Sequence, residues 1–585
     1  MKINNFVVSV IISVVLLTSC NRMDYNEVTI YDEEWMFENE GQVSGLLGIV
    51  YGYIYQGLGD DMNGAMLASA TDESDFSMLL STVHRYYNGA WSSVNAFPNT
   101  WYNSYRGIYA ANDFLENMDR VFELLKEYEH NSEMRGYNEM KRRFDMYPYQ
   151  ARFLRAFYHF ELAKTYGDIP LLTRTLSPSE ANEVERTPVQ EVFKFIVDEC
   201  DAVKEMLPIT YAEESGSHIG RVNRPAVLAL KARALLYAAS PLFNPPSSKE
   251  AWRKAAVACK ELIDFAPGWE IELSEYQDLW AANSYYAVPE IIWFRYIGNT
   301  SQYAYVNYPV GYENTIGGNC PSQTLVDAYE YKSGANVGKS FGEVNGDRFI
   351  NEPYRDLDPR FGMTIAKNGD TWPLIDPYRD NPLETFDGGR NGAPIMNATK
   401  TGYYLKKYIN GNNRVVNPVQ GSHYTWIIFR LAEFYLNYAE AMFHYMDGDA
   451  TAISNGILNM SANGAINVLR NREGIKMPLF DAATNGELWL ERYKRERMVE
   501  LAFEGHRFWD VRRWKDAEAA KSFMQVKTVK VNRVSVPGVE NAYSYTYTRG
   551  PVINRGQWNN KYYLYPIPFV ELKKAVKLEQ NPGWE

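Results

Sequence analysis

The sequence predicts a mainly α protein in which a helical-repeat scaffold carries a large, irregular, loop-rich insertion with a few short strands. Three observations predict this architecture. Pairs of amphipathic helices follow one another between residues 150 and 266, and a similar pair recurs between residues 430 and 472. The chain between these pairs is rich in Gly, Asn, Pro and Tyr and has few periodic stretches, as ordered insertions in a compact protein often do.

The first predicted helix pair begins at Gln150–Tyr166. The apolar residues of this helix recur at helical spacing, and Gly167 followed by Pro170 marks its end. The partner helix begins at Thr187-Pro188, where an N-cap residue precedes a proline at the first helical position, and it continues to Val203. Each helix has one apolar stripe, so we expect the two stripes to pack against each other.

The same helix pattern recurs along the chain. Ala156, Ala234 and Ala439 each stand beside large apolar residues, so that neighbouring helices can approach closely, as in tetratricopeptide-like solenoids. We expect further pairs at 41–55 with 101–121, at 225–238 with 252–263, and at 430–441 with 465–472.

The irregular part of the chain covers residues 290–423 and 526–558. Short strands are predicted at Ile291–Phe294, which is a buried-type apolar run, and at Val526–Val536, where Val alternates with Lys, Asn and Ser. Because loops on a rigid scaffold commonly carry binding residues, we expect a ligand to bind in this half of the chain.

The N-terminus has the pattern of a bacterial lipoprotein signal. Lys2 precedes a short apolar run, Phe6–Leu17, and small residues then precede Cys20. The run is too short to span a bilayer, which needs about 20 apolar residues. We therefore expect residues 1–19 to be a signal peptide and Cys20 to be the site of lipid attachment, palmitate included. The alternative is an ordinary secretion signal with a chance cysteine.

Charge and cysteine content narrow the class of protein. The formal net charge is −12 and no block of Lys and Arg occurs, which excludes nucleic acid as a partner because phosphates need clustered basic residues. Cys200, Cys259 and Cys320 remain besides Cys20, an odd number that cannot form a full disulfide framework. Cys200 and Cys259 lie on apolar helix faces, which favours burial over a bridge.

The sequence contains no catalytic motif. It has no HExxH, no GxSxG and no Cys/His pair at ligand spacing. Asp72, Glu73 and Asp75 form the most compact acidic cluster outside the helices, and loop carboxylates more often accept hydrogen bonds or cap local structure than cleave a bond. Residues 447–449 and 345–347 lack the other ligands of a calcium loop and are predicted to be turns. We therefore predict no enzyme activity and no cofactor, and no calcium site is assignable.

One segment has a clear resemblance to a known family. Residues 491–514, ERYKRERMVELAFEGHRFWDVRRW, resemble the C-terminal signature of the RagB/SusD family of outer-membrane nutrient-binding lipoproteins. Charged and large apolar residues alternate in this segment, which predicts a partly buried ion-pair network. Its charged residues include Glu496, Arg497, Glu500, Glu504, Arg507, Asp510, Arg512 and Arg513. Segments 321–330, 358–361, 430–441, 470–474, 563–568 and 580–584 resemble the same family.

The resemblance implies a function and a domain organisation. A RagB/SusD-like protein would be a lipid-anchored protein on the exterior face of the outer membrane. It would capture an oligosaccharide and deliver it to a SusC-like TonB-dependent transporter, without chemistry. Residues 20–285 would form an N-terminal helical-repeat region, and residues 286–585 a C-terminal RagB/SusD region packed with it as one body. Three alternatives stay open: a surface glycoside hydrolase, a binder of peptides, and a purely structural lipoprotein.

A sugar ligand would require loop aromatics that stack on pyranose rings, with polar groups around them. Trp91 follows the acidic loop, and Tyr285, Tyr286 and Trp372 lie in or beside the irregular half. We expect Trp101, Trp280 and Trp293 to belong to the core instead. The predicted ligand contacts are Asp72, Asp75, Trp91, Tyr285, Tyr286 and Trp372.

Overall fold

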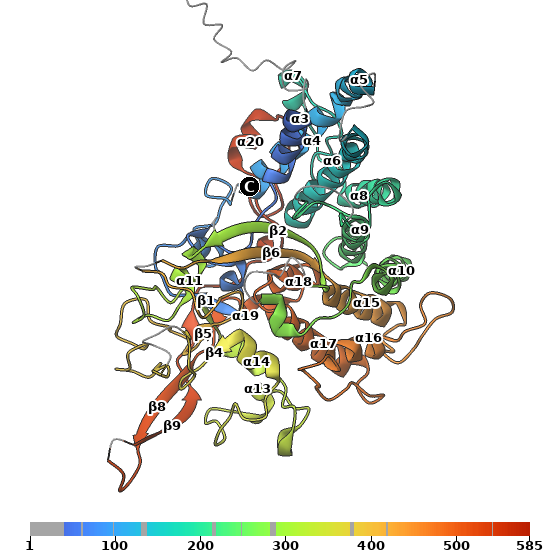
Figure 1. The fold of residues 1–585 in the computed structure, drawn as a ribbon. Coiled ribbons are helices and arrows are strands. Elements are labelled where there is room, and N and C mark those ends of the chain that lie inside the picture. The colour runs from blue at the N-terminus through green and yellow to red at the C-terminus, as the bar shows by residue number, and fades with distance from the viewer. Residues whose placement is uncertain are drawn as a thin grey trace, which may run out of the picture.

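Stacked helices form one side of the molecule, and short helices, strands and loops form the other (Figure 1). The computed structural model describes residues 40–59, 62–97, 99–129, 137–212, 218–246, 248–280, 288–374, 380–416, 419–540 and 542–585. The predicted mainly helical architecture is confirmed. The helices of the stack are α3 (Glu40–Gly52), α4 (Asn99–Glu116), α5 (Met118–Glu129), α6 (Tyr137–Tyr166), α8 (Val189–Val203), α9 (Arg224–Ala239), α10 (Lys249–Phe265), α15 (Leu431–Tyr445) and α16 (Ala462–Arg470).

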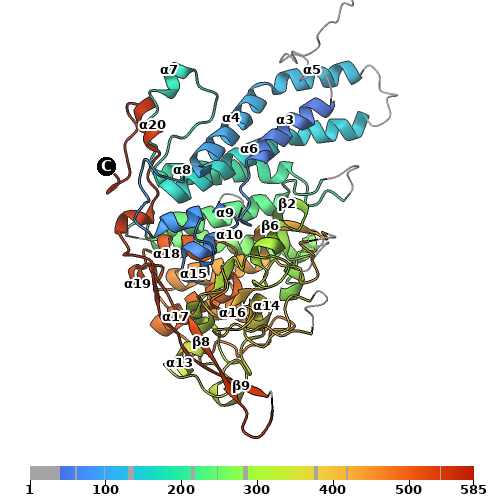
Figure 2. The ribbon, with the colours of Figure 1, turned by 90° about the vertical axis from the view of Figure 1, so that its left-hand side faces the viewer.

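Each helix of the stack packs on the next one. The order runs from α4 and α6 through α8, α9 and α10 to α15 and α16, and Figure 2 shows the helices descending one below another. Since α10 packs on α15, the helices of the C-terminal half continue the series that begins in the N-terminal half. The predicted helix pairs therefore form one continuous scaffold.

Local sequence explains the ends of the first predicted pair. Helix α6 begins at Tyr137, earlier than predicted, and it ends at Tyr166 as predicted, where Gly167 adopts a φ of +75°. Helix α8 begins at Val189, one residue later than predicted, with Pro188 at the N-cap position. Its first N–H group, that of Val189, donates to the Asp168 carboxylate at 2.8 Å, so Asp168 takes the capping role expected of Thr187.

A long antiparallel ribbon, β2 (Ile291–Thr300) and β6 (Ser422–Arg430), crosses the middle of the molecule beside the stack (Figure 1). The strand predicted at Ile291–Phe294 is confirmed and continues to Thr300. The helix predicted to begin at Arg430 begins one residue later, because Arg430 pairs with Ile291 as the last residue of β6.

The irregular half consists of short elements joined by loops. The hairpin of β8 and β9 extends from the lower end of the molecule in both ribbon views (Figures 1 and 2), and it contains most of the strand predicted at Val526–Val536. The helices outside the stack are α7 (Pro178–Ala181), α11 (Gln302–Asn307), α12 (Gln323–Ala328), α13 (Phe341–Val344), α14 (Pro359–Thr364), α17 (Gly486–Glu500), α18 (His506–Arg513), α19 (Ala517–Ser522) and α20 (Phe569–Lys574). The other strands are β1 (Ser74–Phe76), β3 (Asn319–Pro321), β4 (Ile365–Ala366), β5 (Tyr404–Leu405), β7 (Gln525–Val526), β8 (Val529–Ser535), β9 (Tyr543–Arg549) and β10 (Ile553–Asn554).

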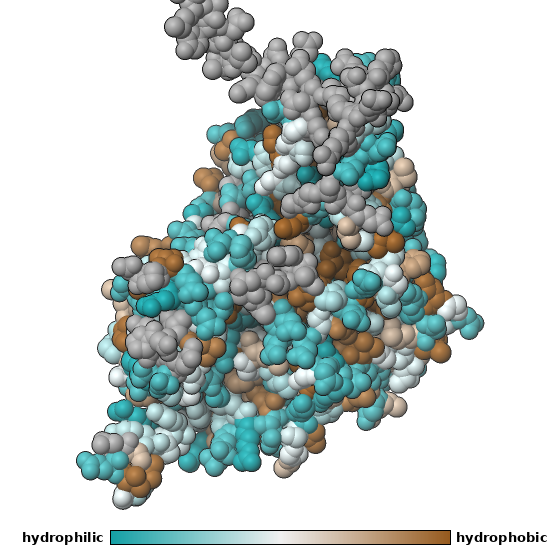
Figure 3. All heavy atoms as spheres, viewed as in Figure 1, coloured by the Kyte–Doolittle hydropathy of each residue, from teal (hydrophilic) through white to brown (hydrophobic). Residues whose placement is uncertain are grey.

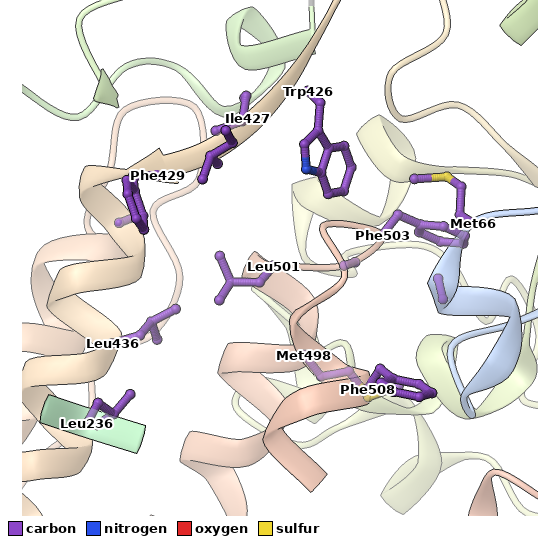
Figure 4. Close-up of a cluster of buried hydrophobic side chains, with 14 of the residues drawn as sticks. Met66, Leu236, Trp426, Ile427, Phe429, Leu436, Met498, Leu501, Phe503 and Phe508 are labelled. Atoms are coloured by element: carbon purple, nitrogen blue, oxygen red, sulfur yellow. The ribbon is translucent and has the colours of Figure 1, made fainter. Parts of the chain in front are cut away.

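The hydrophobic core connects the two halves of the chain. One cluster of buried side chains extends from Val50 to Trp584, and a smaller one lies between α3, α4, α5 and α6. Figure 4 shows side chains from distant elements in this cluster: Leu236 of α9, Phe429 of β6, Leu436 of α15, and Leu501, which follows α17. The prediction that Trp101, Trp280 and Trp293 lie in the core is confirmed. The prediction that Cys200 and Cys259 are buried and form no disulfide is confirmed as well, and Cys320 is also buried without a disulfide.

A buried ion-pair network holds the signature segment in the core, as predicted. Arg430 at the end of β6 donates to Glu290 and Glu500 at 2.8 Å and to Glu504 at 2.7 Å. Arg360 of α14 donates to the other carboxylate oxygen of Glu500, also at 2.8 Å. Because a buried charge is stable only when it is paired, these contacts fix α17 against β6 and α14.

A second group of buried charges connects α15 with α18. Glu440 accepts two hydrogen bonds from Arg513, at 2.5 and 2.7 Å, and Asp510 accepts bonds from both Arg513 and Arg497. Burial alone raises the pKa of Glu440, but the charge and hydrogen bonds of Arg513 outweigh it and lower the pKa to about 2. Arg512 differs from the prediction: its guanidinium lies 3.4 Å from the centre of the Phe508 ring, and burial lowers its pKa to about 10.

Hydrophilic and hydrophobic residues are interspersed over the face shown in Figure 3. Among the helices of the described ranges, none is both long enough and apolar enough to cross a membrane.

Candidate functional site

Two adjoining cavities lie where the N-terminal third of the chain meets the signature segment. The outer cavity has a volume of about 250 Å³ and the inner one about 80 Å³. We call them together the central cleft. Its walls come from the loop after α3, the 3-10 helix Thr82–Tyr86, the first turn of α4, the last third of α6, and α18. Both cavities are lined by Tyr55, Leu67, Phe157, Glu161, Lys164 and Trp509.

Aromatic rings form much of the cleft wall. Tyr86 and Phe97 stack with ring centres 4.0 Å apart, and Trp509 of α18 stacks on Tyr565 at 5.8 Å. Tyr55 is 38% exposed and lines both cavities, so its ring is accessible from solvent. At the inner end, Trp426 projects from β6 beside Phe503 and Met66, and all three line the inner cavity (Figure 4).

The charged groups inside the cleft are mostly paired. Lys164 donates to both carboxylate oxygens of Glu161, at 2.6 and 2.7 Å, and its ammonium lies 4.7 Å from the centre of the Trp509 ring. Burial lowers the pKa of Lys164, and Glu161 opposes this effect. Arg233 pairs with Glu433 at 2.5 and 2.7 Å. Burial and the charge of Arg233 hold the pKa of His506 well below its usual value, so its imidazole is neutral at pH 7.

Three polar groups on the outer cavity have no polar partner within the described part of the chain. The Thr82 hydroxyl is buried and makes no hydrogen bond. Within the described ranges, the Asn103 amide and the half-buried Arg85 guanidinium likewise have neither a hydrogen bond nor an ion pair, and the Arg85 guanidinium lies 5.8 Å from the centre of the Phe97 ring. Buried polar groups are normally satisfied, so the Thr82 hydroxyl is an exception within the described residues. The half-buried Asn103 and Arg85 groups lie on the same aromatic cavity, which makes this cavity a candidate ligand site.

Helix α4 separates the central cleft from a second depression, which we call the α4 groove. This groove has a volume of about 580 Å³ and is lined by Tyr102, Tyr105, Arg106 and Tyr109 from another face of α4. Several of its polar groups already have partners: the Tyr105 hydroxyl donates to the Pro170 carbonyl, Arg174 pairs with Glu180, and Lys574 pairs with Glu571. The central cleft is therefore the better candidate for a polar ligand.

The structure places Asp72 and Asp75 in the core, which corrects their assignment as ligand contacts. Asp72 is 1% exposed and accepts two hydrogen bonds from Arg507, at 2.8 and 3.0 Å. Asp75 is 5% exposed and accepts from Arg555 at 2.7 Å. Both carboxylates tie the acidic loop to the C-terminal part of the chain, because a buried carboxylate is most stable beside a guanidinium.

Trp91 also lies in the core, and its assignment as a sugar-stacking residue is corrected. Its side chain is 2% exposed. One face of its ring is stacked on Tyr562, with ring centres 5.4 Å apart, and Tyr86, Tyr565 and Trp584 enclose it at 4.8–5.1 Å. No face of the ring is free for a ligand.

Of the remaining predicted contacts, only Trp372 lies within the described residues. Trp372 is 7% exposed, and its ring packs on Gly411, where a β-carbon would lie 2.5 Å from the ring; its assignment as a ligand contact is corrected as well. Tyr285 and Tyr286 lie outside the described residues, as does Cys20.

The sequence reasoning missed the residues that line the central cleft. Trp509 belongs to the signature segment, whose residues were all assigned to architecture. Arg85 follows the acidic loop by ten residues, and only the fact that no described residue pairs with it distinguishes it from an ordinary surface arginine. No group of three or more His, Cys, Asp or Glu side chains within the described ranges is arranged to hold a metal ion.

Two family models match the chain. The model described as the SusD family matches residues 289–584, and a model described as "Starch-binding associating with outer membrane" matches residues 43–236. The first covers half of the chain, and the two together cover most of it.

Individual proteins are similar as well. The SusD-like protein P2 of Formosa agariphila is 27% identical over 63% of this chain and 64% of its own length, so the chain spans less than two thirds of that relative. A SusD-like protein from Bacteroides fragilis superimposes with a TM-score of 0.73 at 22% identity, over 95% of this chain and 99% of the other. A SusD-like carbohydrate-binding protein from the same species has a TM-score of 0.69 at 22% identity, over 93% of this chain and 100% of the other.

The family match is consistent with the fold, since the two SusD-like structures superimpose on nearly all of this chain. It also agrees with the signature segment, because residues 491–514 lie inside the matched range and form the buried ion-pair network. The chain belongs to the SusD family.

Proposed function

We propose that the protein binds oligosaccharides in the central cleft without transforming them. The observation that carries the proposal is the convergence of accessible aromatic rings with unpartnered polar groups in one cavity. Aromatic faces suit the apolar faces of sugar rings, and hydroxyl, amide and guanidinium groups suit their hydroxyls. The family match and the carbohydrate-binding neighbour support this ligand class.

The charges in the cleft favour binding over hydrolysis. A glycosidase needs two carboxyl groups beside the bond, one of them protonated to act as the acid. Glu161 is held by Lys164, and Glu504 is held by Arg430 and Lys407. Burial raises the pKa of Glu504, but these two cations outweigh it and lower the pKa overall, so Glu504 is ionised and cannot donate a proton.

We further propose that Cys20 anchors the protein by lipid to the outer membrane, that the protein faces the exterior, and that it delivers its ligand to a SusC-like TonB-dependent transporter. The signal pattern before Cys20 and the description "associating with outer membrane" support this proposal. Copurification of a large barrel protein from native membranes would test the partner, and palmitate labelling of the wild type against Cys20→Ala would test the anchor. A wild type that is not labelled would contradict the anchor.

Binding is tested by electrophoresis of the purified full-length protein in gels that contain one polysaccharide each. We expect at least one polysaccharide to retard the wild type, and Tyr55→Ala to weaken retention at least about fivefold, which corresponds to about 1 kcal/mol. Tyr109→Ala, in the α4 groove, is the matched control, since Tyr109 is also exposed but lies outside the cleft.

Three results would contradict the proposed function. Release of new reducing ends from the polysaccharide would indicate a glycoside hydrolase. Retention that is lost in Tyr109→Ala but kept in Tyr55→Ala would move the site to the α4 groove. Retention by none of the polysaccharides, with binding of peptides instead, would change the ligand class.

A further inference from the structure

We infer that the saccharide bound in the central cleft carries an anionic group, a carboxylate or a sulfate ester, which pairs with Arg85 beside the first turn of α4. This inference rests on the proposed function and specifies the ligand class for the same site. It goes beyond sugar binding because it predicts that charged saccharides bind and that their neutral forms bind far less.

The first argument is the charge balance of the cleft. Five charged side chains line it: Arg85, Glu161, Lys164, Arg233 and Glu504. Four of them have a partner of opposite charge, since Glu161 pairs with Lys164, Arg233 with Glu433, and Glu504 with Arg430 and Lys407. Within the described residues, Arg85 has no such partner. Among the described residues that line the cleft, one positive charge is therefore unpaired, although the whole chain has a net charge of −12.

The second argument is the orientation of α4. Asn99, Thr100 and Asn103, at the start of this 18-residue helix, line the same outer cavity as Arg85. The N-terminus of a helix has a partial positive charge and favours anions, and acidic side chains often occupy it. The first turn of α4 contains no acidic residue. The helix end and the guanidinium thus add positive potential to one cavity.

The third argument is the geometry of the donors. A guanidinium is planar and forms two parallel N–H···O bonds with a carboxylate or a sulfate. The Phe97 ring supports the Arg85 guanidinium from one side at 5.8 Å, and Phe97 is itself stacked on Tyr86. The Thr82 hydroxyl and the Asn103 amide, both without partners in the described structure, lie on the same cavity and can donate to an oxyanion or to neighbouring hydroxyls.

The experiment compares charged polysaccharides with their neutral derivatives in affinity electrophoresis of the full-length protein. Polygalacturonate is paired with its fully methyl-esterified form, which removes the carboxylate charge. A panel of sulfated polysaccharides, dextran sulfate included, is paired with the desulfated chains. The first pair identifies a carboxylate and the second a sulfate ester. Neutral polysaccharides complete the panel. The variants are Arg85→Gln and Arg85→Lys, with Arg106→Gln as the control because Arg106 lies on another face of α4.

We expect at least one charged polysaccharide to be retained and its neutral form to be retained far less. Arg85→Gln should weaken retention about ten- to hundredfold, because a hydrogen-bonded ion pair is lost, and Arg85→Lys should restore part of it. Arg106→Gln should have no effect, and added salt should weaken retention of the wild type.

Two results would overturn the inference and leave the proposed function intact. One is retention by neutral polysaccharides only. The other is retention of a charged polysaccharide that does not change in Arg85→Gln, with unchanged melting temperature of the variant as evidence that it is folded. Retention by no polysaccharide at all would contradict the proposed function as well.

Discussion

Replacement of Trp91 by alanine separates a structural role from a role in binding. The sequence suggested a sugar-stacking residue, whereas the structure encloses the ring between Tyr562, Tyr565 and Trp584 of the C-terminal tail. We therefore expect Trp91→Ala to destabilise the protein and to leave the cleft residues Tyr55 and Arg85 able to bind.

The magnitude follows from burial. Truncation of a buried tryptophan to alanine costs about 3–5 kcal/mol, because transfer energy is lost and a cavity remains. Trp91 is 2% exposed, so the full cost applies. The unfolding entropy of a chain of 585 residues is about 1.2 kcal/mol/K, so the melting temperature should fall by about 2–4 °C. Trp91→Phe keeps most of the ring contacts and should lose less.

The assay combines differential scanning calorimetry with affinity electrophoresis of the same samples. Trp91→Ala should melt earlier than the wild type and, below its melting temperature, be retained within about threefold of the wild type, a difference of under about 0.7 kcal/mol. A variant that melts like the wild type but is no longer retained would refute the reasoning, because the ring would then contact the ligand.

Three further predictions concern packing, charge and thiols. Gly107→Ala should cost about 1–3 kcal/mol in the free energy of unfolding, because the new β-carbon would lie 2.4 Å from the Tyr158 ring. Gly48→Ala, inside α3 and with no atom within 4 Å, should instead stabilise the fold by up to about 1 kcal/mol. Equal melting temperatures of the two variants would contradict the α4–α6 packing. The folded-state pKa of Glu440 is lowered from 4.5 to about 2, so its ion pair stabilises the fold fully above about pH 4.5, and this stabilisation is lost as the pH falls toward 2. Glu440→Gln should cost about 3–5 kcal/mol in the free energy of unfolding at pH 7. Denaturant titrations that show no difference from the wild type would contradict this. Cys200, Cys259 and Cys320 are buried, and burial raises the pKa of each thiol. Ellman's reagent should therefore label these three thiols only after unfolding. Rapid labelling of any of them in the native protein would show that this thiol is exposed.

Helix prediction succeeded where the signal was local. The apolar stripe of α8 and the glycine after α6 are properties of neighbouring residues, and both helices end where these residues indicate. The start of α6 at Tyr137 was missed, because Pro148 made an earlier start improbable from local rules. The ion-pair network was also predictable, since interleaved Glu and Arg beside large apolar residues are stable in a core only as pairs.

Site prediction failed where the answer depended on distant residues. Trp91 and Trp372 stand in polar loops that follow an Asn-Gly pair, which is typical of exposed positions, yet both rings are buried by segments far away in the sequence. Conversely, Trp509 stands in a segment that looks like pure core, yet its ring lines the central cleft together with its neighbours Lys164 and Tyr565.

The sequence by itself determined the helical-repeat scaffold, the family and the pairing of the signature charges, because periodicity, capping residues and charge alternation act over a few residues. Only the tertiary structure decided which aromatic rings are covered and which polar groups remain without partners. Exposure of a side chain is set by whatever the folded chain places beside it: Trp584 covers Trp91, and no acidic residue of the described chain reaches Arg85.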